Sequence, residues 1–447
     1  MQQQDAAQGS GLRTVSFAAG YDDADRSAAD ARTARWFDAV KLGFHEQRAD
    51  PARQPAMVDA YQRDGRILTA VYDDAAPEFA WDPAVPVATY ASMVNNLNVG
   101  GGRLLPTHLV TSVTVRSTHR RRGILRAMIS ADLLRARESG LCLAALNASE
   151  ATIYGRFGFG AATSTAEVAV DTRGGVEFRT AAVGATAVAD NPRLGELAPQ
   201  LFDAHLERTP GALGRQYAYG LRAAGTWSQH DSEPDKALRG IIHYNDDGVP
   251  DGYATYRFKG WDTEPVTLQV TDLIAATDEA YRELWRSLGA IDLADRVTFN
   301  AASVADPLPW MLADRRRYEV TGVDDVLWLR ILNTKAALEA RHYTGAGGLV
   351  LTVRDPLGLA DGAWHLTAGN GRGTAAALEG GLPPSGIEMS GIETADIDVD
   401  ALGSLYLGGV SARTLAAAGG IRGSGAALDI LDSLFTAGPA PYCSTHF

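Results

Sequence analysis

Apolar and polar residues recur along the chain in a pattern that predicts mixed strands and helices. In the first part of the chain, apolar residues at helical spacing predict two helices, and β-branched or alternating runs predict four strands. The expected helices are Ala28–Phe44 and Gln54–Arg63, and the expected strands are Arg66–Tyr72, Val85–Asn98, Thr111–Val115 and Thr163–Val170. We expect the last of these strands to close a first domain.

The order strand, helix, strand returns in the next part of the chain. Helices are expected at Leu194–Glu207 and Asp278–Leu288, and strands at Ala237–His243, Gly252–Phe258, Val266–Ala275 and Arg296–Asn300. From Val326 the pattern changes to an α+β arrangement. Its expected strands are Val326–Leu332, Leu349–Asp355 and Trp364–Gly369, and its expected helices are Thr334–Ala340, Ala412–Ala418 and Leu428–Phe435. The Gly- and Ala-rich stretch Gly369–Gly381 is expected to be a loop.

The chain length predicts more than one domain. A chain of 447 residues exceeds what one hydrophobic core supports. We place a disordered leader at residues 1–13, a first domain at 14–172, a second at 173–325 and a third at 326–447. A content of 46% hydrophobic and 21% charged residues is typical of a globular protein.

Charge and cysteine content exclude several classes of function. The formal net charge of −13 argues against a nucleic-acid partner and is compatible with a cationic substrate. Cys142 and Cys443 give neither a disulfide framework nor a zinc spacing, so no metal site is expected. No apolar run reaches the ~18 residues of a membrane span, and the polar start lacks the features of a signal peptide. We therefore expect a cytoplasmic protein, with secretion by a non-classical route left open.

The densest chemistry follows the strand that ends at Val115. The run Arg120–Gly123 (Arg-Arg-Arg-Gly) comes next, and apolar residues at helical spacing then continue to a stop at Gly140. A helix that begins in this way offers free backbone N–H groups, the positive end of its dipole and guanidinium groups. Together these bind a pyrophosphate. Gly123 has no Cβ, so the backbone there can approach a phosphate closely.

The arginine run alone does not establish a ligand site. Arginine runs are often solvated surface with no ligand. The segment is also neither a dinucleotide fingerprint nor a P-loop, because it lacks Gly-x-Gly-x-x-Gly and Gly-Lys-Ser/Thr. The neighbouring motifs favour a ligand site.

These motifs resemble those of a known family. Arg120-x-x-Gly123 resembles the acyl-CoA pyrophosphate loop of the GNAT N-acetyltransferases, and Tyr154-Gly-Arg-Phe-Gly-Phe159 resembles their Tyr-x-x-x-Gly-Phe element. The loop departs from the family pattern at Leu125, where the family has Gly or Ala. The segments THRRRGILRAM and ASEATIYGRFGFG are similar to the Eis (enhanced intracellular survival) branch. Similarity continues at DPLPWMLAD, LWLRILN, AALEAR and LGSLYLGG, and it is weakest before Val94 and over residues 170–250.

The resemblance implies a fold and an assembly. The implied fold is α/β with α+β parts: two GNAT-like domains, the second degenerate, followed by a C-terminal sterol-carrier-protein-like α+β domain. The second copy is not expected to bind the cofactor, because its corresponding junction, Ala276-Thr-Asp-Glu, has neither Arg nor Gly and is acidic. The family also implies a homohexamer, a trimer of dimers.

The resemblance further implies roles for single residues. The cofactor, acetyl-CoA, is expected to contact Val113, Val115, Arg120, Arg121, Gly123, Ile124, Asn147 and Ser149. Tyr154 is expected to donate the proton that the departing thiolate needs, since a phenol is protonated at neutral pH. The terminal carboxylate on Phe447 is expected to act as the base. Glu46 and Trp36 are expected at the substrate, with core packing at least as strongly favoured for Trp36. His446 departs from the acidic residue that the family has at this position; it is expected at the substrate, either to assist proton removal or only to lower the negative charge of the pocket.

These inferences define one expected function and two alternatives. We expect an acetyl-CoA-dependent N-acetyltransferase that acetylates amines of polycationic, aminoglycoside-type substrates by direct attack, in a cleft shared with the last domain. The first alternative is acetylation of lysine side chains in proteins or peptides. The second is a lipid-binding module whose acetyltransferase domain is vestigial. The intact Arg-x-x-Gly loop and Tyr154 oppose the second alternative.

Overall fold

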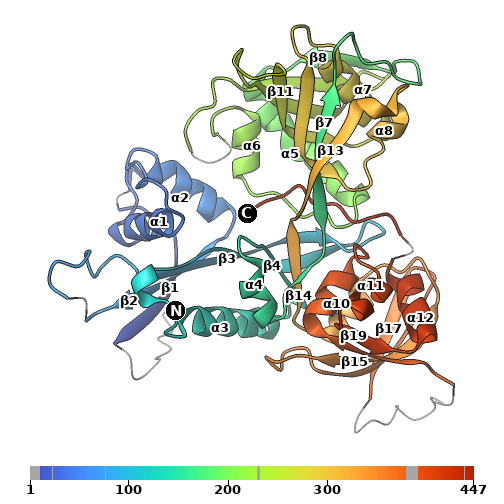
Figure 1. Cartoon of the computed structure of the whole chain (residues 1–447). Helices are drawn as coiled ribbons and strands as arrows, with labels where there is room; N and C mark the ends of the chain where they lie inside the picture. Colours follow the sequence, from blue (N-terminus) through green and yellow to red (C-terminus); the bar gives the residue numbers. More distant parts are fainter. Residues whose placement is uncertain (1–10, 23, 76, 229–231, 379–390, 437) are drawn as a thin grey trace.

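The computed structural model describes residues 11–22, 24–75, 77–228, 232–378, 391–436 and 438–447. The first domain is built on a seven-stranded sheet in the order β1-β2-β3-β4-β5-β14-β6 (Figure 1). Its strands are β1 (Leu12–Ala18), β2 (Ile67–Asp73), β3 (Ala88–Asn98), β4 (Leu104–Val115), β5 (Leu143–Asn147), β6 (Gly160–Ala161) and β14 (Leu327–Ile331). Its helices are α1 (Ala31–Gly43), α2 (Gln54–Arg63), α3 (Ile124–Glu138) and α4 (Ala151–Tyr154).

Helices cover both faces of the first sheet. Leu68, Ala70 and Tyr72 of β2 pack with the side chains of α1 and α2. Val71, between them in sequence, packs instead with the apolar side of α3. Successive strand residues point to opposite faces, so α1 and α2 lie on one face and α3 on the other.

The two parallel strands β4 and β5 diverge. They pair only at His108↔Ala144 and Leu109↔Ala145, although β4 continues to Val115. The pairing of β4 with β3 shifts register after Thr111, and Ser112 adopts a φ of 52°. The β5-facing edge of β4 is therefore left without a strand partner beyond Leu109.

The second domain repeats this plan. Its seven-stranded sheet has the order β13-β7-β12-β11-β10-β9-β8. The strands are β7 (Ser164–Asp171), β8 (Ala185–Val188), β9 (Arg239–Tyr244), β10 (Pro250–Phe258), β11 (Thr267–Ala275), β12 (Arg296–Ser303) and β13 (Tyr318–Asp325), and the helices are α5 (Asn191–Arg208), α6 (Ala218–Ala223), α7 (Asp278–Gly289) and α8 (Leu308–Met311). The predicted strands and helices of this domain are present, within a few residues of the expected bounds.

The third domain has a five-stranded sheet in the order β17-β16-β15-β18-β19. Its strands are β15 (Gly347–Arg354), β16 (Gly362–Gly369), β17 (Arg372–Ala377), β18 (Thr394–Asp398) and β19 (Ile421–Gly423), and its helices are α9 (Thr334–Ala340), α10 (Val399–Tyr406), α11 (Ala412–Ala417) and α12 (Gly425–Phe435). Strand β17 lies where a loop was expected. The rest of that stretch, beyond Leu378, falls outside the described residues.

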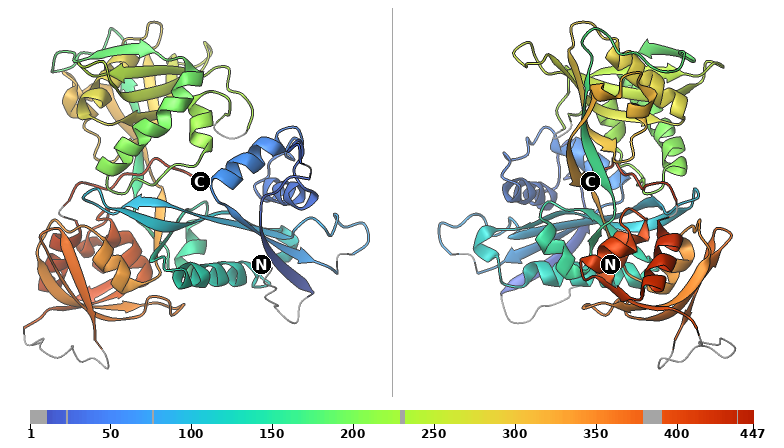
Figure 2. Two further views of the ribbon diagram at one scale, coloured as in Figure 1. Left: turned by 180° about the vertical axis from the view of Figure 1, so that it is seen from behind. Right: turned by 45° about the vertical axis from the view of Figure 1, so that its right-hand side comes forward.

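Two strands lie in a different sheet from the one expected. Strand β7, expected to close the first domain, pairs with β12 and β13 of the second sheet. Strand β14, expected to open the third domain, is inserted in the first sheet between β5 and β6. The chain thus crosses between the first two domains through neighbouring strands, as Figure 2 shows from two further sides.

The ends of the chain also differ from expectation. Strand β1 begins at Leu12 and pairs along its length with β2, so the expected leader is too long by two residues. Residues 1–10 lie outside the described residues. At the other end, the chain leaves α12 and returns between the first and second domains, where the C-terminus lies (Figure 1).

Candidate active site

A basic loop joins β4 to α3. After Arg116 the chain makes one turn of 3-10 helix, Ser117–His119, and reaches α3 through Gly123. Arg121 and Gly123 adopt φ values of 63° and 77°. A Cβ built on Gly123 would meet nothing within 4 Å, so the loop faces open space there. The first backbone N–H groups of α3, from Ile124 on, have no partner within the helix and point toward that space.

The arginines of this loop divide into two groups. Arg122 lies 3.3 Å from the carboxylate of Asp73, and His119 Nε2 lies 3.0 Å from the same oxygen. The His119 hydrogen bond in particular holds the pKa of Asp73 below its usual value. This contact fixes the loop to β2. The side chains of Arg120 and Arg121 are exposed and make no ion pair or hydrogen bond within the described part of the chain.

These features fit the pyrophosphate and pantetheine arm of an acyl-CoA. Two unpaired guanidinium groups, a glycine with open space above it and the start of a 15-residue helix suit a doubly charged pyrophosphate. Val113 and Val115 are half-buried in the part of β4 that β5 does not pair with. The backbone of that edge is available to the amides of a pantetheine arm.

Strand β5, the second of the two divergent strands, ends at Asn147. Its side-chain Nδ2 donates to the carbonyl oxygen of Val326 at 2.9 Å, and its Oδ1 accepts from the backbone N–H of Phe447 at 2.9 Å. The Asn147 side chain therefore holds the end of the chain. Ser149 follows two residues later and is exposed in the bend before α4.

Tyr154 closes α4 and is 7% exposed. Its ring meets the edge of Phe159, with the two centroids 6.3 Å apart. Burial, and then the charge of Glu150, raise the pKa of Tyr154 above its ordinary value. Its hydroxyl has no hydrogen-bond partner among the described residues. The phenol is protonated at neutral pH and free to donate.

A cavity of about 330 Å³ lies beside β4 and contains the end of the chain. One wall is made by the first domain, through α1, α2 and residues Thr111 and Ser112 of β4. The opposite wall is made by the second domain. His446 and Phe447 complete the lining. We expected this cleft to be shared with the last domain, but the described cavity is formed by the first two domains and receives only the final residues of the chain.

The three expected substrate residues lie in different surroundings. Glu46 lines the cavity, with its carboxylate 2.5 Å from Lys41 Nζ. His446 also lines it, and partial removal from water together with Arg222 and Arg215 lowers the pKa of its imidazole. Trp36 is fully buried among Phe37, Val58 and Leu68, and its indole N–H donates to the carbonyl of Thr69. The expectation that Trp36 lines the cavity is wrong, because its ring is needed between α1 and the sheet.

Sequence reasoning missed the wall that the second domain supplies. It comprises Gln216, Ala218, Arg222, Trp227 and Ser232. These residues lie in and around the short helix α6, which was not expected and carries no motif. Only its aromatic residues and Arg222 could have drawn attention to this segment.

The described parts of the chain give no sign of a metal or a membrane span. Within them, no group of three or more His, Cys, Asp or Glu side chains is arranged to hold a metal ion. None of the described helices is long and apolar enough to cross a bilayer.

Divergent parallel strands, a basic Gly loop at a helix start and a buried tyrosine after the second strand define a GNAT-type acetyltransferase. Residues 25–162 and residues 219–331 each match an acetyltransferase (GNAT) domain family, and residues 334–444 match the sterol carrier protein domain family. The expected fold, with two GNAT domains and a sterol-carrier-like C-terminal domain, is confirmed.

Whole-chain comparisons narrow this class. The chain is 36% identical over 375 residues to the N-acetyltransferase Eis of Mycobacterium tuberculosis, covering 80% of this chain and 83% of that protein. It is 34% identical over 443 residues to an uncharacterized N-acetyltransferase of Streptomyces avermitilis, covering 95% and 99%. The crystal structure of Eis1 from Mycobacterium abscessus superposes with a TM-score of 0.74 at 27% identity, over 92% of this chain and 96% of that one. The chain belongs to the Eis family of GNAT N-acetyltransferases.

Proposed function

We propose that this enzyme transfers the acetyl group of acetyl-CoA to a primary amine by direct attack, and that only the first domain binds acetyl-CoA. The observation that carries the proposal is the hydrogen bond from the Phe447 backbone to Asn147. It brings the last residue of the chain to the end of β5, seven residues before Tyr154, which ends α4 and begins the Tyr-x-x-x-Gly-Phe motif. In this proposal, the terminal carboxylate and the protonated phenol of Tyr154 act on the reacting groups at the end of the divergent strands.

Each group in this proposal has one task. Acetyl-CoA supplies a thioester carbonyl, held by Arg120, Arg121 and the start of α3. The carboxylate of Phe447 accepts a proton from the substrate ammonium, which frees the nitrogen lone pair for attack on that carbonyl. Tyr154 donates its proton to the thiolate as the carbon–sulfur bond breaks. The attacking nitrogen loses its second proton to the tyrosinate as the amide forms, and the carboxylate of Phe447 releases the first proton to solvent. No acyl-enzyme is needed.

For the acceptor, we propose a polycationic amine of the aminoglycoside type. The net charge of −13 favours approach of such a molecule, and Glu46 stands on the cavity wall. Lys41 neutralises part of this attraction in the free enzyme. A polycation would compete with Lys41 for the Glu46 carboxylate.

The second candidate acceptor is a lysine side chain in a peptide that also carries an acidic group. Arg222 favours this second acceptor class. Arg222 lines the cavity and forms no ion pair within the described residues. Its Nε–H is buried and has no acceptor among them. A peptide carboxylate would satisfy this group, whereas a polycation would be repelled by it.

One assay separates these proposals. Coenzyme A release from acetyl-CoA should be measured with an aminoglycoside panel and with lysine peptides that have acidic or neutral neighbours. Release with aminoglycosides, lost in Glu46→Gln, supports the first acceptor class. Release confined to acidic lysine peptides, lost in Arg222→Gln, supports the second. No release with any amine contradicts the proposed transfer and favours the lipid-binding alternative. The homohexamer implied by the family stays a prediction, which light scattering of the purified protein checks.

A further inference from the structure

The second domain contains a groove like the one that would hold the pantetheine arm in the first. Its parallel strands β11 and β12 pair from Thr267↔Arg296 to Val270↔Phe299 and then separate, although β11 runs on to Ala275. This divergence matches that of β4 and β5. The sheet order around it is also the same, since β9, β10, β11 and β12 are consecutive neighbours.

This second groove is unsuited to a coenzyme. Helix α7, which follows β11, begins with Asp278 and Glu279 after the capping residue Thr277. Two carboxylates at the positive end of a helix repel a pyrophosphate and cancel the dipole that would attract it. The sequence of this junction contains no arginine, and Arg208, which lines the same cavity from α5, is already ion-paired with Asp278 at 2.5 Å.

The groove instead contains the end of the chain. We call residues 439–447 the tail. A cavity of about 280 Å³ is lined by Leu273 and Ala275 of β11, by Phe299 and Ala302 of β12, and by Pro439, Ala440 and Tyr442 of the tail. The Tyr442 hydroxyl donates to the carbonyl of Ala301, and the Tyr442 backbone N–H donates to the carbonyl of Pro210 at 2.8 Å.

Two backbone carbonyls of the divergent strands have partners within the protein. The carbonyl of Ala301 on β12 accepts from Tyr442, and the carbonyl of Ala275 on β11 lies 3.3 Å from His205 Nδ1. The His205 ring in turn meets the edge of the Tyr442 ring, with centroids 6.1 Å apart. Backbone carbonyls in such a groove need partners, and here the tail and α5 provide them.

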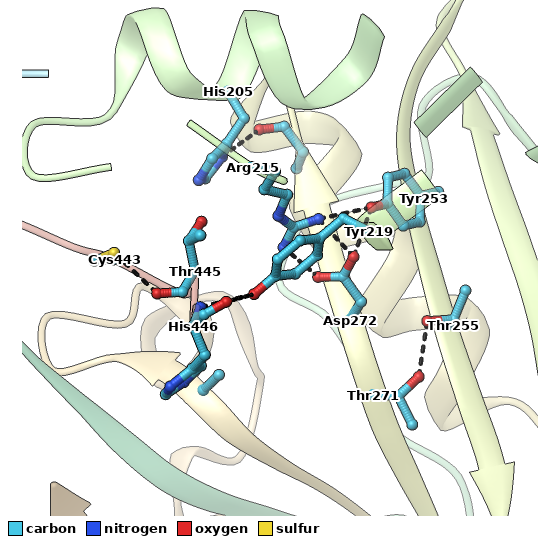
Figure 3. A network of polar contacts seen from close by, with 12 residues as sticks. His205, Arg215, Tyr219, Tyr253, Thr255, Thr271, Asp272, Cys443, Thr445 and His446 are labelled. Atoms are coloured by element: carbon cyan, nitrogen blue, oxygen red, sulfur yellow. Dashed lines mark hydrogen bonds and ion pairs between the residues drawn. The ribbon is translucent and has the colours of Figure 1, made fainter. Parts of the chain in front are cut away.

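Beyond Tyr442 the tail is buried at Cys443 and Thr445 and hydrogen-bonded at Thr445, His446 and Phe447. Cys443 and Thr445 are buried, and Thr445 Oγ1 donates to the carbonyl of Leu213 at 2.8 Å. The Tyr219 hydroxyl accepts from the His446 N–H at 2.7 Å and donates to the His446 carbonyl at 3.1 Å. Figure 3 shows Tyr219 between the His446 backbone and a buried polar cluster.

That cluster fixes the Tyr219 ring. Arg215 stacks over the Tyr219 ring at 4.3 Å from its centroid, and forms two hydrogen bonds of 2.7 Å with Asp272 of β11. Tyr253 of β10 donates to the same carboxylate at 2.6 Å. Arg215 lies in the loop before α6, and two side chains of the divergent sheet, Asp272 and Tyr253, fix its position against Tyr219.

We propose that the groove of the second domain serves as the binding site for this chain's own tail, and that Tyr219 positions Phe447 for the reaction. The proposal rests on the proposed function, in which Phe447 supplies the base. Tyr219 does not line the cavity around Phe447 and is a positioning residue. Tyr219 belongs to the second domain and binds the backbone of His446. Asn147 belongs to the first domain and binds the backbone of the following residue, Phe447.

Two measurements on Tyr219→Phe test the proposal. The variant keeps the ring and removes the hydroxyl. Amide hydrogen exchange should accelerate over residues 439–447, because the His446 N–H loses its acceptor. The turnover number should fall about tenfold, equivalent to one or two hydrogen bonds, with the Michaelis constant for acetyl-CoA unchanged. The matched control is Tyr343→Phe, which loses a hydroxyl bound to the backbone carbonyl of Leu338 at 2.8 Å and should change neither quantity.

The double variant shows whether Tyr219 acts through Phe447. Combining Tyr219→Phe with removal of Phe447 should cost no more turnover than removal of Phe447 alone. Additive losses, or unchanged exchange in the tail, overturn the proposal. Binding of two acetyl-CoA molecules per chain overturns the assignment of the groove. If the intact enzyme releases no coenzyme A with any amine, the proposed function fails, while hydrogen exchange still decides whether Tyr219 holds the tail.

Discussion

Gly123 offers a sharp test of the coenzyme site. Its φ of 77° costs an L-residue about 1 kcal/mol, and since a Cβ there meets nothing within 4 Å, no steric term adds to this cost. Gly123→Ala should therefore lower the free energy of unfolding by only about 1 kcal/mol. The new methyl group, however, occupies the space in which the pyrophosphate would approach the start of α3. Displacing a charged ligand from one or two backbone N–H groups costs about 1.5–3 kcal/mol, so the acetyl-CoA dissociation constant should rise at least about tenfold.

Gly140 provides the matched control for this variant. It follows the other end of α3, has a φ of 90°, and its Cβ would also meet nothing within 4 Å. Gly140→Ala thus introduces the same backbone strain on the same helix, away from the proposed ligand. Isothermal titration calorimetry with acetyl-CoA, and thermal unfolding without it, separate the two effects. Equal acetyl-CoA affinities in the two variants would falsify the placement of the pyrophosphate.

Three further predictions concern other parts of the molecule. Arg120→Ala and Arg121→Ala should each raise the Michaelis constant for acetyl-CoA about fivefold with little change in stability, because both side chains are exposed and unpaired within the described residues; unchanged constants in both would contradict their role. Burial lowers the pKa of His205 to about 4. Between about pH 6.5 and pH 4 the unfolded chain therefore binds a proton that the folded chain does not. The free energy of unfolding falls as the pH is lowered through that window. His205→Gln should remove up to about 3 kcal/mol of this acid-dependent loss in denaturant titrations, and an unchanged slope would refute it. Asp355→Asn should destabilise by about 3–5 kcal/mol, since it leaves Arg330 as an uncompensated charge with 0% side-chain exposure, and urea unfolding checks this; a loss below about 1 kcal/mol would show that water reaches the pair.

The sequence allowed most elements to be predicted but not all of their partners. Helix α2 has the expected bounds, Gln54–Arg63, because its apolar spacing and the proline after its first residue are local signals. Strand β1 was missed because it is an edge strand in which four of the seven residues are exposed. The exchange of β7 and β14 between sheets was missed for a different reason. Alternation predicts that a segment is a strand, but pairing depends on which edges are free in three dimensions.

The candidate site divides in the same way. The Arg-x-x-Gly loop and Tyr154 were found because the start of a helix and a local motif require particular residues at particular spacings. A tryptophan at helical spacing suits a core position and a cavity wall equally well, so the sequence left both positions open for Trp36. The structure places it in the core. Arg222 and Tyr219 had no local signal. Their positions follow from how α6 packs across from the first domain, which no spacing in the sequence records.

The exchanged strands explain how a site divided between domains can stay aligned. Strand β7 leaves the first domain through Gly160–Ala161 of β6 and enters the second sheet, and β13 returns from that sheet directly into β14. Two neighbouring strands therefore link the sheet that carries Asn147 to the sheet that fixes Tyr219. The Asn147 side chain itself donates to Val326, at the junction of β13 and β14. Any rotation of one domain against the other would strain this junction. Asn147, which binds Phe447, and Tyr219, which binds His446, therefore move as one unit, and the last residue of the chain stays at the end of β5.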